Sequence, residues 1–185
     1  TVDTSKHFTL YRLTLDPKDS TRYLLDGKSV ALDKTTVTVQ VKQADGSLKG
    51  QSHTVYSSQF GPVVQWPGRL DWDAHAAYSL RDANLDNTRV VQQWYQINRA
   101  DSLAALKGSV EQLQGIPWVN TLAVDQGGRA LYLNQSVVPY VDQQLLDTCS
   151  SPQAQGRLVV LDGSRSACQW KVDAQAAQPG ILPAR

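Results

Sequence analysis

The sequence predicts an α/β fold of the α+β kind, built from antiparallel strands with flanking helices. Apolar and polar residues alternate at strand period in the first third of the chain, with turn residues between the alternating runs. From Asn87 to Gly115 the apolar residues fall at helical spacing instead. The Gly127-Gly128 pair then separates two short apolar runs, which is typical of a β-hairpin.

Four segments of the first half have strand character. Residues His7–Leu15 and Thr35–Lys42 alternate as HFTLYRLTL and TTVTVQVK, which predicts half-buried strands. A turn at Ala44–Gly46 connects the second of these to a strand through His53–Tyr56, and Ala76–Leu80 forms another short strand. The remaining segments carry turn residues, at Asp16-Pro17, Asp26-Gly27, Gly61-Pro62 and Pro67-Gly68.

Two helices follow these strands. The first carries Val90 to Ile97 at helical spacing, with Asn87 or Thr88 as its N-cap. The second begins after Asp101 and ends at Gly115. The last forty residues have little periodicity and are expected to be rich in loops, apart from a short strand at Leu158–Leu161.

Composition excludes several classes of partner. At 185 residues the chain is long enough for one domain with a sizeable core. Its 18 basic and 17 acidic residues leave a net charge of +1, which gives no electrostatic case for binding nucleic acid or an anionic membrane surface. No apolar stretch approaches the roughly 20 residues that span a bilayer. We therefore expect a soluble protein that binds neither nucleic acid nor membrane.

The two cysteines, Cys149 and Cys168, flank a short apolar run and an Asp162-Gly163 turn, a layout that suits a disulfide closing a loop or hairpin. Closing such a loop contributes on the order of 3 kcal/mol in the chain-entropy account. Two free buried thiols are the alternative. A disulfide favours an oxidising compartment such as the periplasm. Two cysteines without a nearby histidine offer too few ligands for zinc.

Polar residues that could carry chemistry are scattered along the chain. Thr1 has the residue type of an N-terminal nucleophile, but the sequence does not show that this end is a processed one. His7, His53 and His75 lie in no recognisable motif, so a triad assembled in space competes with exposed or structural histidines.

The carboxylates of Asp71 and Asp73, on either side of Trp72, could serve a metal or a glycosidic bond. They equally suit one face of an exposed turn. The sequence contains no glycine-rich phosphate loop of either standard form.

The aromatic residues are more informative. Trp94 lies on the first predicted helix, where it could line a pocket for an apolar ligand or belong to the core. Trp118 lies in the compact turn Gly-Ile-Pro-Trp-Val-Asn, where Pro117 restricts the backbone and places the indole near Asn120. Trp66 and Trp72 belong to a loop.

Six segments together resemble a known family. In order, they are TVDTSKHFTLYRL, YSSQFGPVV, YSLRDANLDNTRVVQQWYQINRADSL, QGIPWVNTLAVDQGGRALYLNQSVVP, LDGSRSACQW and PGILP. The whole chain thereby resembles the β-subunit of acyl-homoserine lactone acylases, in the penicillin acylase group of N-terminal nucleophile hydrolases. The likeness extends to members that act in quorum quenching and pyoverdine maturation in pseudomonads. It implies a partial N-terminal nucleophile hydrolase fold, with residues 1–185 as a single fragment of the β-subunit.

The resemblance implies one catalytic element in this chain. In the family, a serine released by autoproteolytic processing at the start of the β-subunit is the nucleophile, and its own amine is the base. That serine is expected upstream of Thr1, and an asparagine that supplies an oxyanion donor is expected beyond Arg185. The Thr-Val-Asp segment resembles the strand that supplies the other donor, which makes Val2 a backbone N–H of the oxyanion hole. Such a donor contributes about 2.7 to 4 kcal/mol of barrier lowering.

Three further positions match the family's acyl-binding cavity, and these are Trp94, Trp118 and Val119. By resemblance they line the slot for the fatty acyl tail. Penicillin G acylases hold calcium partly through acidic residues after the oxyanion strand, where this chain has Ser5, Lys6 and His7, so we expect no metal. No cofactor is expected.

The implied activity is hydrolysis of the amide bond of N-acyl-homoserine lactones or related long-chain fatty amides. Its partners would be the α-subunit, the rest of the β-subunit and the fatty-acyl amide substrate. Alone, this chain is expected to be inactive and to self-associate through uncovered sheet edges. The alternatives are a penicillin or lipopeptide acylase of the same family, and a β-rich binding module without enzymatic activity.

Overall fold

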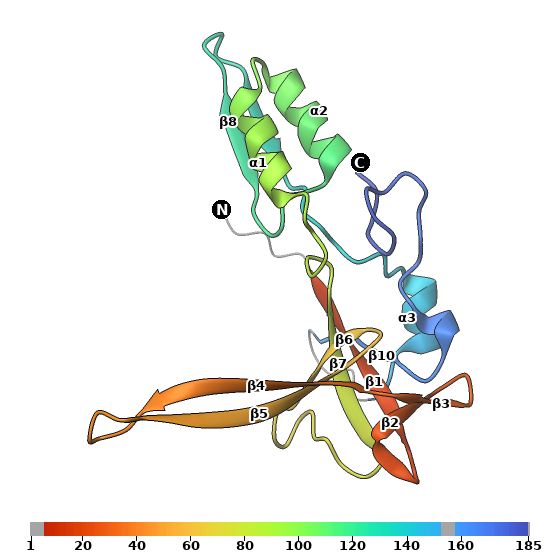
Figure 1. Cartoon of the computed structure of the whole chain (residues 1–185). Helices are drawn as coiled ribbons and strands as arrows, with labels where there is room; N and C mark the ends of the chain where they lie inside the picture. The colour runs from red at the N-terminus through yellow and green to blue at the C-terminus, as the bar shows by residue number, and fades with distance from the viewer. Residues whose placement is uncertain (1–5, 153–157, 185) are drawn as a thin grey trace. The chain divides into compact units, whose positions relative to one another are not determined.

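The chain folds as a mixed α+β protein, which confirms the predicted fold class (Figure 1). The structure, a computed structural model, describes residues 6–152 and 158–184. The chain divides into two compact units. Unit 1 comprises Thr1–Thr9, Asp82–Thr148 and Gln169–Arg185, and unit 2 comprises Leu10–Arg81 and Cys149–Cys168.

Most strands belong to one sheet with the order β3-β2-β1-β7-β6-β5-β4, and β10 pairs in parallel with β1. Adjacent strands from β4 to β7 pair antiparallel, as β1 to β3 do. The bounds of these strands are β1 Phe8–Asp16, β2 Asp19–Leu25, β3 Lys28–Ala31, β4 Asp33–Lys42, β5 Leu48–Ser58, β6 Gly61–Val64, β7 Ala76–Asp82 and β10 Val160–Asp162.

The predicted strands at the start of the chain and around the Ala44–Gly46 turn are confirmed as β1, β4 and β5, and the one at Ala76–Leu80 as β7. The sequence prediction had only turns between β1 and β4, whereas the structure adds β2 and β3 there. Asp26 and Gly27 connect them with φ angles of 48° and 76°. Positive φ at both central residues is the geometry of the type I′ turn, one of the two common two-residue hairpin loops.

Strands β4 and β5 form a long two-stranded ribbon, because only the last two residues of β5 pair with β6 (Figure 1). One face of the ribbon carries Val37, Val39, Val41 and Val55, all of them exposed. We call these four residues the valine face. The opposite face is mostly polar apart from Leu48, and on it Thr38 is hydrogen-bonded to Ser52 across the strands at 2.8 Å. A two-stranded ribbon alone is only marginally stable in water.

The core of unit 2 lies under β1. Leu10, Leu70, Tyr78 and Val160 form one buried cluster. The Tyr11 ring stacks on Phe60 with 3.9 Å between ring centroids, and the Tyr11 hydroxyl donates to the carbonyl of Cys168. Leu10 and Tyr11 are consecutive in β1, so this strand contributes buried side chains on both of its faces.

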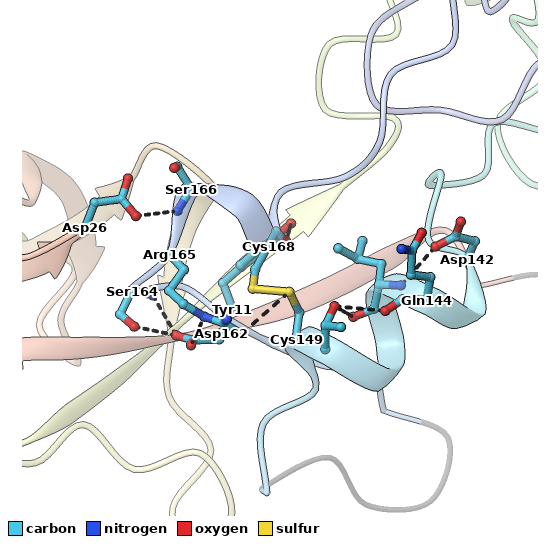
Figure 2. Close-up of a disulfide and its surroundings, with 12 residues drawn as sticks. Tyr11, Asp26, Asp142, Gln144, Cys149, Asp162, Ser164, Arg165, Ser166 and Cys168 are labelled. Atoms are coloured by element: carbon cyan, nitrogen blue, oxygen red, sulfur yellow. Dashed lines mark hydrogen bonds and ion pairs between the residues drawn. A yellow bond between two sulfur atoms is a disulfide. The ribbon is translucent and has the colours of Figure 1, made fainter.

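The predicted disulfide is present and joins Cys149 to Cys168 (Figure 2). Cys149 is the last residue of helix α3 (Gln143–Cys149), and Cys168 ends the 3₁₀ helix η1 (Ser166–Cys168). The Asp26 carboxylate accepts the Ser166 backbone N–H at 3.0 Å. The disulfide thus belongs to a segment that is also attached to the β2–β3 hairpin.

Asp162 ends β10 beside this disulfide. Its carboxylate accepts the backbone N–H and the hydroxyl of Ser164 at 2.9 and 2.6 Å, and the Nε–H of Arg165 at 2.9 Å (Figure 2). Burial favours the neutral acid, but the hydrogen bonds from Ser164 and Arg165 outweigh it, so the pKa of Asp162 lies below its ordinary value of 3.8.

In the Asp162→Asn variant, the free energy of unfolding is expected to vary less with pH in the acidic range. Because the folded-state pKa of Asp162 is lowered, its contribution is complete above the unfolded pKa and is lost as pH falls through the folded value. The unmodified protein should therefore be more stable than the variant at pH 7, by at most about 1 kcal/mol for a partly exposed group, and the difference should shrink below about pH 4. Urea unfolding at a series of pH values measures this, and a constant difference would contradict it.

Unit 1 contains the helices α1 (Val90–Arg99), α2 (Leu103–Leu113) and most of α3, with a two-stranded sheet of β8 (Thr121–Val124) and β9 (Ala130–Leu133). Helices α1 and α2 lie side by side (Figure 1). Val110, Ile116 and Leu133 form a buried cluster in this unit. Helix α3 is missing from the sequence prediction. Within the described part of the chain, no helix is long and apolar enough to cross a membrane.

The ends of the helices differ in detail from the predictions. The N-cap of α1 is Arg89, without a side-chain cap bond, rather than Asn87 or Thr88. Ser102 caps α2 as its hydroxyl accepts the Ala105 N–H at 3.2 Å. The left-handed residue that ends α2 is Gln114, with φ 46° and ψ 44°, rather than Gly115.

Candidate functional site

The turn that follows α2, residues 114–120, carries the exposed indole of Trp118. The Trp118 side chain is 55% exposed, and Trp94 on α1 is 44% exposed. No ring contact between these two indoles is found in the described residues. Val119 is half-buried and packs against the cluster of Val110, Ile116 and Leu133. Val119 thus anchors the backbone of the turn to the core of unit 1, while the indole of the neighbouring Trp118 is exposed.

Five successive backbone carbonyls through this turn accept hydrogen bonds. Arg89 Nε donates to the Leu113 carbonyl at 2.9 Å, and its Nη2 donates to the Gln114 carbonyl at 3.2 Å. The Val137 N–H donates to the Ile116 carbonyl at 2.9 Å. The two asparagines of the segment before α1 hold the remaining carbonyls.

Asn87 Nδ2 donates to the Gly115 carbonyl at 3.0 Å, and Asn84 Nδ2 donates to the Pro117 carbonyl at 3.2 Å. Asn87 also donates to Asn84 Oδ1 at 3.2 Å, which orients the Asn84 amide. Unpaired buried carbonyls are costly, so these donors stabilise an irregular backbone without helix or sheet hydrogen bonds.

Gly115 lies in direct contact with helix α1. Its N–H donates to the Oε1 of Gln93 at 3.0 Å, and Gln93 is fully buried. A Cβ atom at residue 115 would lie 2.7 Å from the Cβ of Gln93 and 2.9 Å from the carbonyl oxygen of Arg89. Only glycine allows this approach of the turn to the helix.

The C-terminal segment supports the same turn. Arg89 Nη1 donates to Gln178 Oε1 at 2.6 Å, and the Nε2 of Gln178 donates to the carbonyl of Ala83. Burial of the Arg89 guanidinium lowers its pKa below the ordinary value of an arginine. The Gln114 side chain accepts the Ala177 N–H and donates to the Leu182 carbonyl, both at 2.8 Å. These bonds explain why a glutamine, rather than a glycine, takes the left-handed position.

Three hollows in unit 1 have volumes of about 240, 480 and 560 Å³. They lie beside the C-terminal segment, between α1 and α2, and between the start of α2 and the β8–β9 turn. Neither Trp94 nor Trp118 lines any of the three. The acyl slot that the family resemblance places at these indoles therefore stays a prediction.

The other polar candidates have structural partners. Asp71 accepts the Gly68 N–H, and Asp73 accepts the backbone N–H groups of His75 and Ala76, so both carboxylates shape turns.

The Nδ1 atom of His7 is 2.9 Å from the Val137 carbonyl within unit 1, while His53 lies on β5 of unit 2. Among residues 6–152 and 158–184, no three histidine, cysteine or acidic side chains come together as a metal site. Thr1 and Val2, including the predicted oxyanion donor, lie outside the described residues.

The chain belongs to the penicillin amidase family, whose match extends over residues 1–185. It is 85% identical over its whole length to the acyl-homoserine lactone acylase PvdQ of Pseudomonas putida. It is also 40% identical, over 98% of its length, to the aculeacin-A acylase of Actinoplanes utahensis. The chain spans about a quarter of the length of these relatives, 24% and 23% respectively.

A solved structure shares the fold. The thermostable penicillin G acylase of Alcaligenes faecalis superposes with a TM-score of 0.71, covering 100% of this chain and 28% of that one at 16% identity. At this low identity the likeness concerns the fold alone. It agrees with the sequence-based expectation of a partial N-terminal nucleophile hydrolase fold.

The sequence prediction placed Trp118 and Val119 in a compact turn but missed the residues that hold that turn. Asn87 was named only as a possible N-cap, and Asn84, Arg89 and Gln93 were given no role. One signal was available, since Gln93 lies three residues after Val90 and four before Ile97, on the helix face that these apolar residues share, and the structure buries it fully. A polar residue there requires a buried partner, which is the Gly115 N–H.

Proposed function

We propose that this chain is part of an amidohydrolase that cleaves N-acyl-homoserine lactones or related long-chain fatty amides. The observation that supports this most strongly is the 85% identity, over every residue of the chain, to an acyl-homoserine lactone acylase. We also propose a role in quorum quenching or in maturation of a siderophore precursor, as the family resemblance of the sequence implies. The buried disulfide supports a periplasmic location, because such bonds persist in oxidising compartments.

In this proposal the chain contributes one oxyanion donor and part of the acyl-binding wall. The backbone N–H of Val2 would stabilise the negative charge that develops on the amide oxygen during attack. The attacking serine and the asparagine donor would come from other parts of the complete acylase. Trp94, Trp118 and Val119 would contact the acyl tail, so that apolar burial sets the preference for chain length.

The partners proposed for this chain are the remaining segments of the same acylase, in its α-subunit and β-subunit. Two observations support them. The matched relatives are about four times longer than this chain. The valine face of the β4–β5 ribbon is exposed although its residues are apolar. We propose that another segment of the complete acylase covers the valine face. In the isolated chain the same face would favour self-association.

A lipopeptide acylase is the second candidate, favoured by the 40% identity to aculeacin-A acylase. The two candidates share a reaction and differ in the amine that leaves. Comparing release of fatty acid from acyl-homoserine lactones and from acylated peptides by the complete protein distinguishes them. Hydrolysis of neither substrate would refute both.

Trp118→Ala in the complete acylase is expected to weaken hydrolysis of long-chain substrates more than that of short-chain ones. If the indole covers about 60 Å² of the tail, its loss costs about 1.5 kcal/mol, or about a tenfold loss in kcat/KM. The measurement is kcat/KM for dodecanoyl- and butanoyl-homoserine lactone. Trp66→Ala is the matched control, since Trp66 is an equally exposed indole in unit 2. An equal loss at both chain lengths would rule out the role of Trp118.

A further inference from the structure

We propose that Asn84 is a positioning residue that fixes the direction of Trp118 and so sets selectivity for acyl-chain length. This inference rests on the proposed function, because it assigns a support to the proposed acyl-binding wall. Asn84 does not belong to that wall itself. It acts through the peptide group that immediately precedes Trp118.

The hydrogen bond from Asn84 to the turn holds a single peptide plane. Asn84 Nδ2 donates to the Pro117 carbonyl at 3.2 Å, and this carbonyl belongs to the peptide that ends at the Trp118 nitrogen. Rotation of that peptide would turn the Cα–Cβ bond of Trp118, and with it the indole. Since the indole is 55% exposed, packing of the side chain within this chain restrains it less than a buried ring would be restrained. The backbone is therefore the main restraint on its direction.

Hydrogen bonds hold both the side chain and the backbone of Asn84. Its Oδ1 accepts from Asn87 Nδ2 at 3.2 Å, and its backbone N–H donates to the Asp82 carboxylate at 2.8 Å. Asn87 is buried and also holds the Gly115 carbonyl. Asn87 thus holds the start of the turn at Gly115, whereas the Nδ2 of Asn84 holds the peptide plane next to Trp118. Selectivity is expected to depend on Asn84 more than overall stability does.

Asn84→Asp removes the hydrogen bond to the Pro117 carbonyl and keeps an acceptor for Asn87. The carboxylate keeps an oxygen that accepts from Asn87, but it presents a second oxygen, in place of the amide donor, to the Pro117 carbonyl. Repulsion between these oxygens should rotate the peptide away. Asn98→Asp is the matched control, because Asn98 is an exposed asparagine on α1 and the substitution makes the same change of charge. Asn84→Ala removes the donor without adding charge.

The first measurement is the ratio of kcat/KM for dodecanoyl- and butanoyl-homoserine lactone in the complete acylase. Loss of one hydrogen bond of ordinary strength predicts about a tenfold fall in this ratio for Asn84→Asp, through KM for the long substrate and with kcat largely retained. Asn98→Asp should leave the ratio unchanged. An unchanged ratio in both Asn84 variants, or an equal loss for both substrates, would overturn the inference.

The second measurement does not need activity. The protein is labelled with 5-fluorotryptophan, and the Trp118 fluorine resonance is assigned from its absence in Trp118→Phe. We expect this resonance to shift in Asn84→Asp and to stay in place in Asn98→Asp, with urea midpoints confirming that both variants fold. An unshifted resonance would overturn the positioning role. A shifted resonance in a protein that hydrolyses neither lactone would support the positioning and refute the proposed function instead.

Discussion

Gly115→Ala is expected to destabilise the protein by about 1 to 3 kcal/mol, the usual cost of adding a methyl group where there is no room. The added carbon would lie 2.7 Å from the Cβ of Gln93 and 2.9 Å from the Arg89 carbonyl oxygen. Neither atom is the free end of a flexible side chain. The turn would have to move away from α1, and the bond from the Gly115 N–H to Gln93 would lengthen or break.

Gly108→Ala provides the control for this prediction. Gly108 lies inside α2, and nothing lies within 4 Å of a Cβ built on it. Alanine in a helix interior is favoured over glycine by roughly 0.5 to 1 kcal/mol, so this variant should be slightly more stable than the unmodified protein. Urea unfolding of the two variants should thus give changes of opposite sign. A Gly115→Ala variant as stable as the unmodified protein would show that the turn tolerates displacement.

Displacement of this turn also has a functional consequence. The Gly115 and Pro117 carbonyls are held by Asn87 and Asn84, which precede α1, so the turn and α1 are coupled through the same short segment. We expect Gly115→Ala to reduce kcat/KM for dodecanoyl-homoserine lactone more than for the butanoyl compound, as Trp118 moves with the turn. Stability and chain-length selectivity should change together in this variant, whereas Asn84→Asp should change mainly selectivity.

Local sequence patterns predicted most of the elements that have a clear apolar periodicity. The β4–β5 ribbon follows from strict alternation and a turn between its strands, and α1 and α2 follow from helical spacing. The sequence prediction missed β2 and β3 because both strands are mostly exposed. Tyr23 is the one buried side chain of the two strands. The Asp26-Gly27 turn was recognised, but not the hairpin that it connects.

The support of the Trp118 turn could not be predicted in the same way. Its hydrogen bonds join residues that are far apart in sequence, such as Asn84 with Pro117 and Arg89 with Gln178. Their donors are amides and a guanidinium, which sequence patterns assign equally well to solvent. Trp118 itself was recognisable from its proline neighbour and from the family motif. The residues that hold the backbone beside the Trp118 indole could be identified only from the folded structure.

Loss of the Cys149–Cys168 disulfide is the other large effect that we expect. Replacing both cysteines by alanine should destabilise the protein by about 3 kcal/mol, the loop-entropy value for a closure of this size. The bond closes a separation of 19 residues. Both cysteines are buried, at 3% and 0% exposure, so the substitution also removes packed sulfur atoms from the core.

The disulfide also lies close to β10, the strand that pairs with β1. Cys168 accepts from the Tyr11 hydroxyl through its carbonyl, and β10 pairs with β1 at Leu10, Tyr11 and Arg12 (Figure 2). Between the two cysteines, β10 pairs with β1, and the Asp162 turn follows β10. Without the disulfide, only non-covalent contacts hold β10 and the Asp162 turn against β1. We therefore expect β10 to separate from β1 before the rest of the sheet unfolds.

Urea unfolding with and without dithiothreitol tests this directly. Reductant should lower the midpoint of the unmodified protein toward that of the double alanine variant, and it should leave the variant unchanged. Because the sulfurs are buried, reduction should be slow in the native protein and fast in urea. Hydrogen exchange should then show lost protection first at Val160 and Leu161. Equal midpoints for the oxidised protein and the variant would mean that the disulfide adds no stability beyond that of β1–β10 pairing.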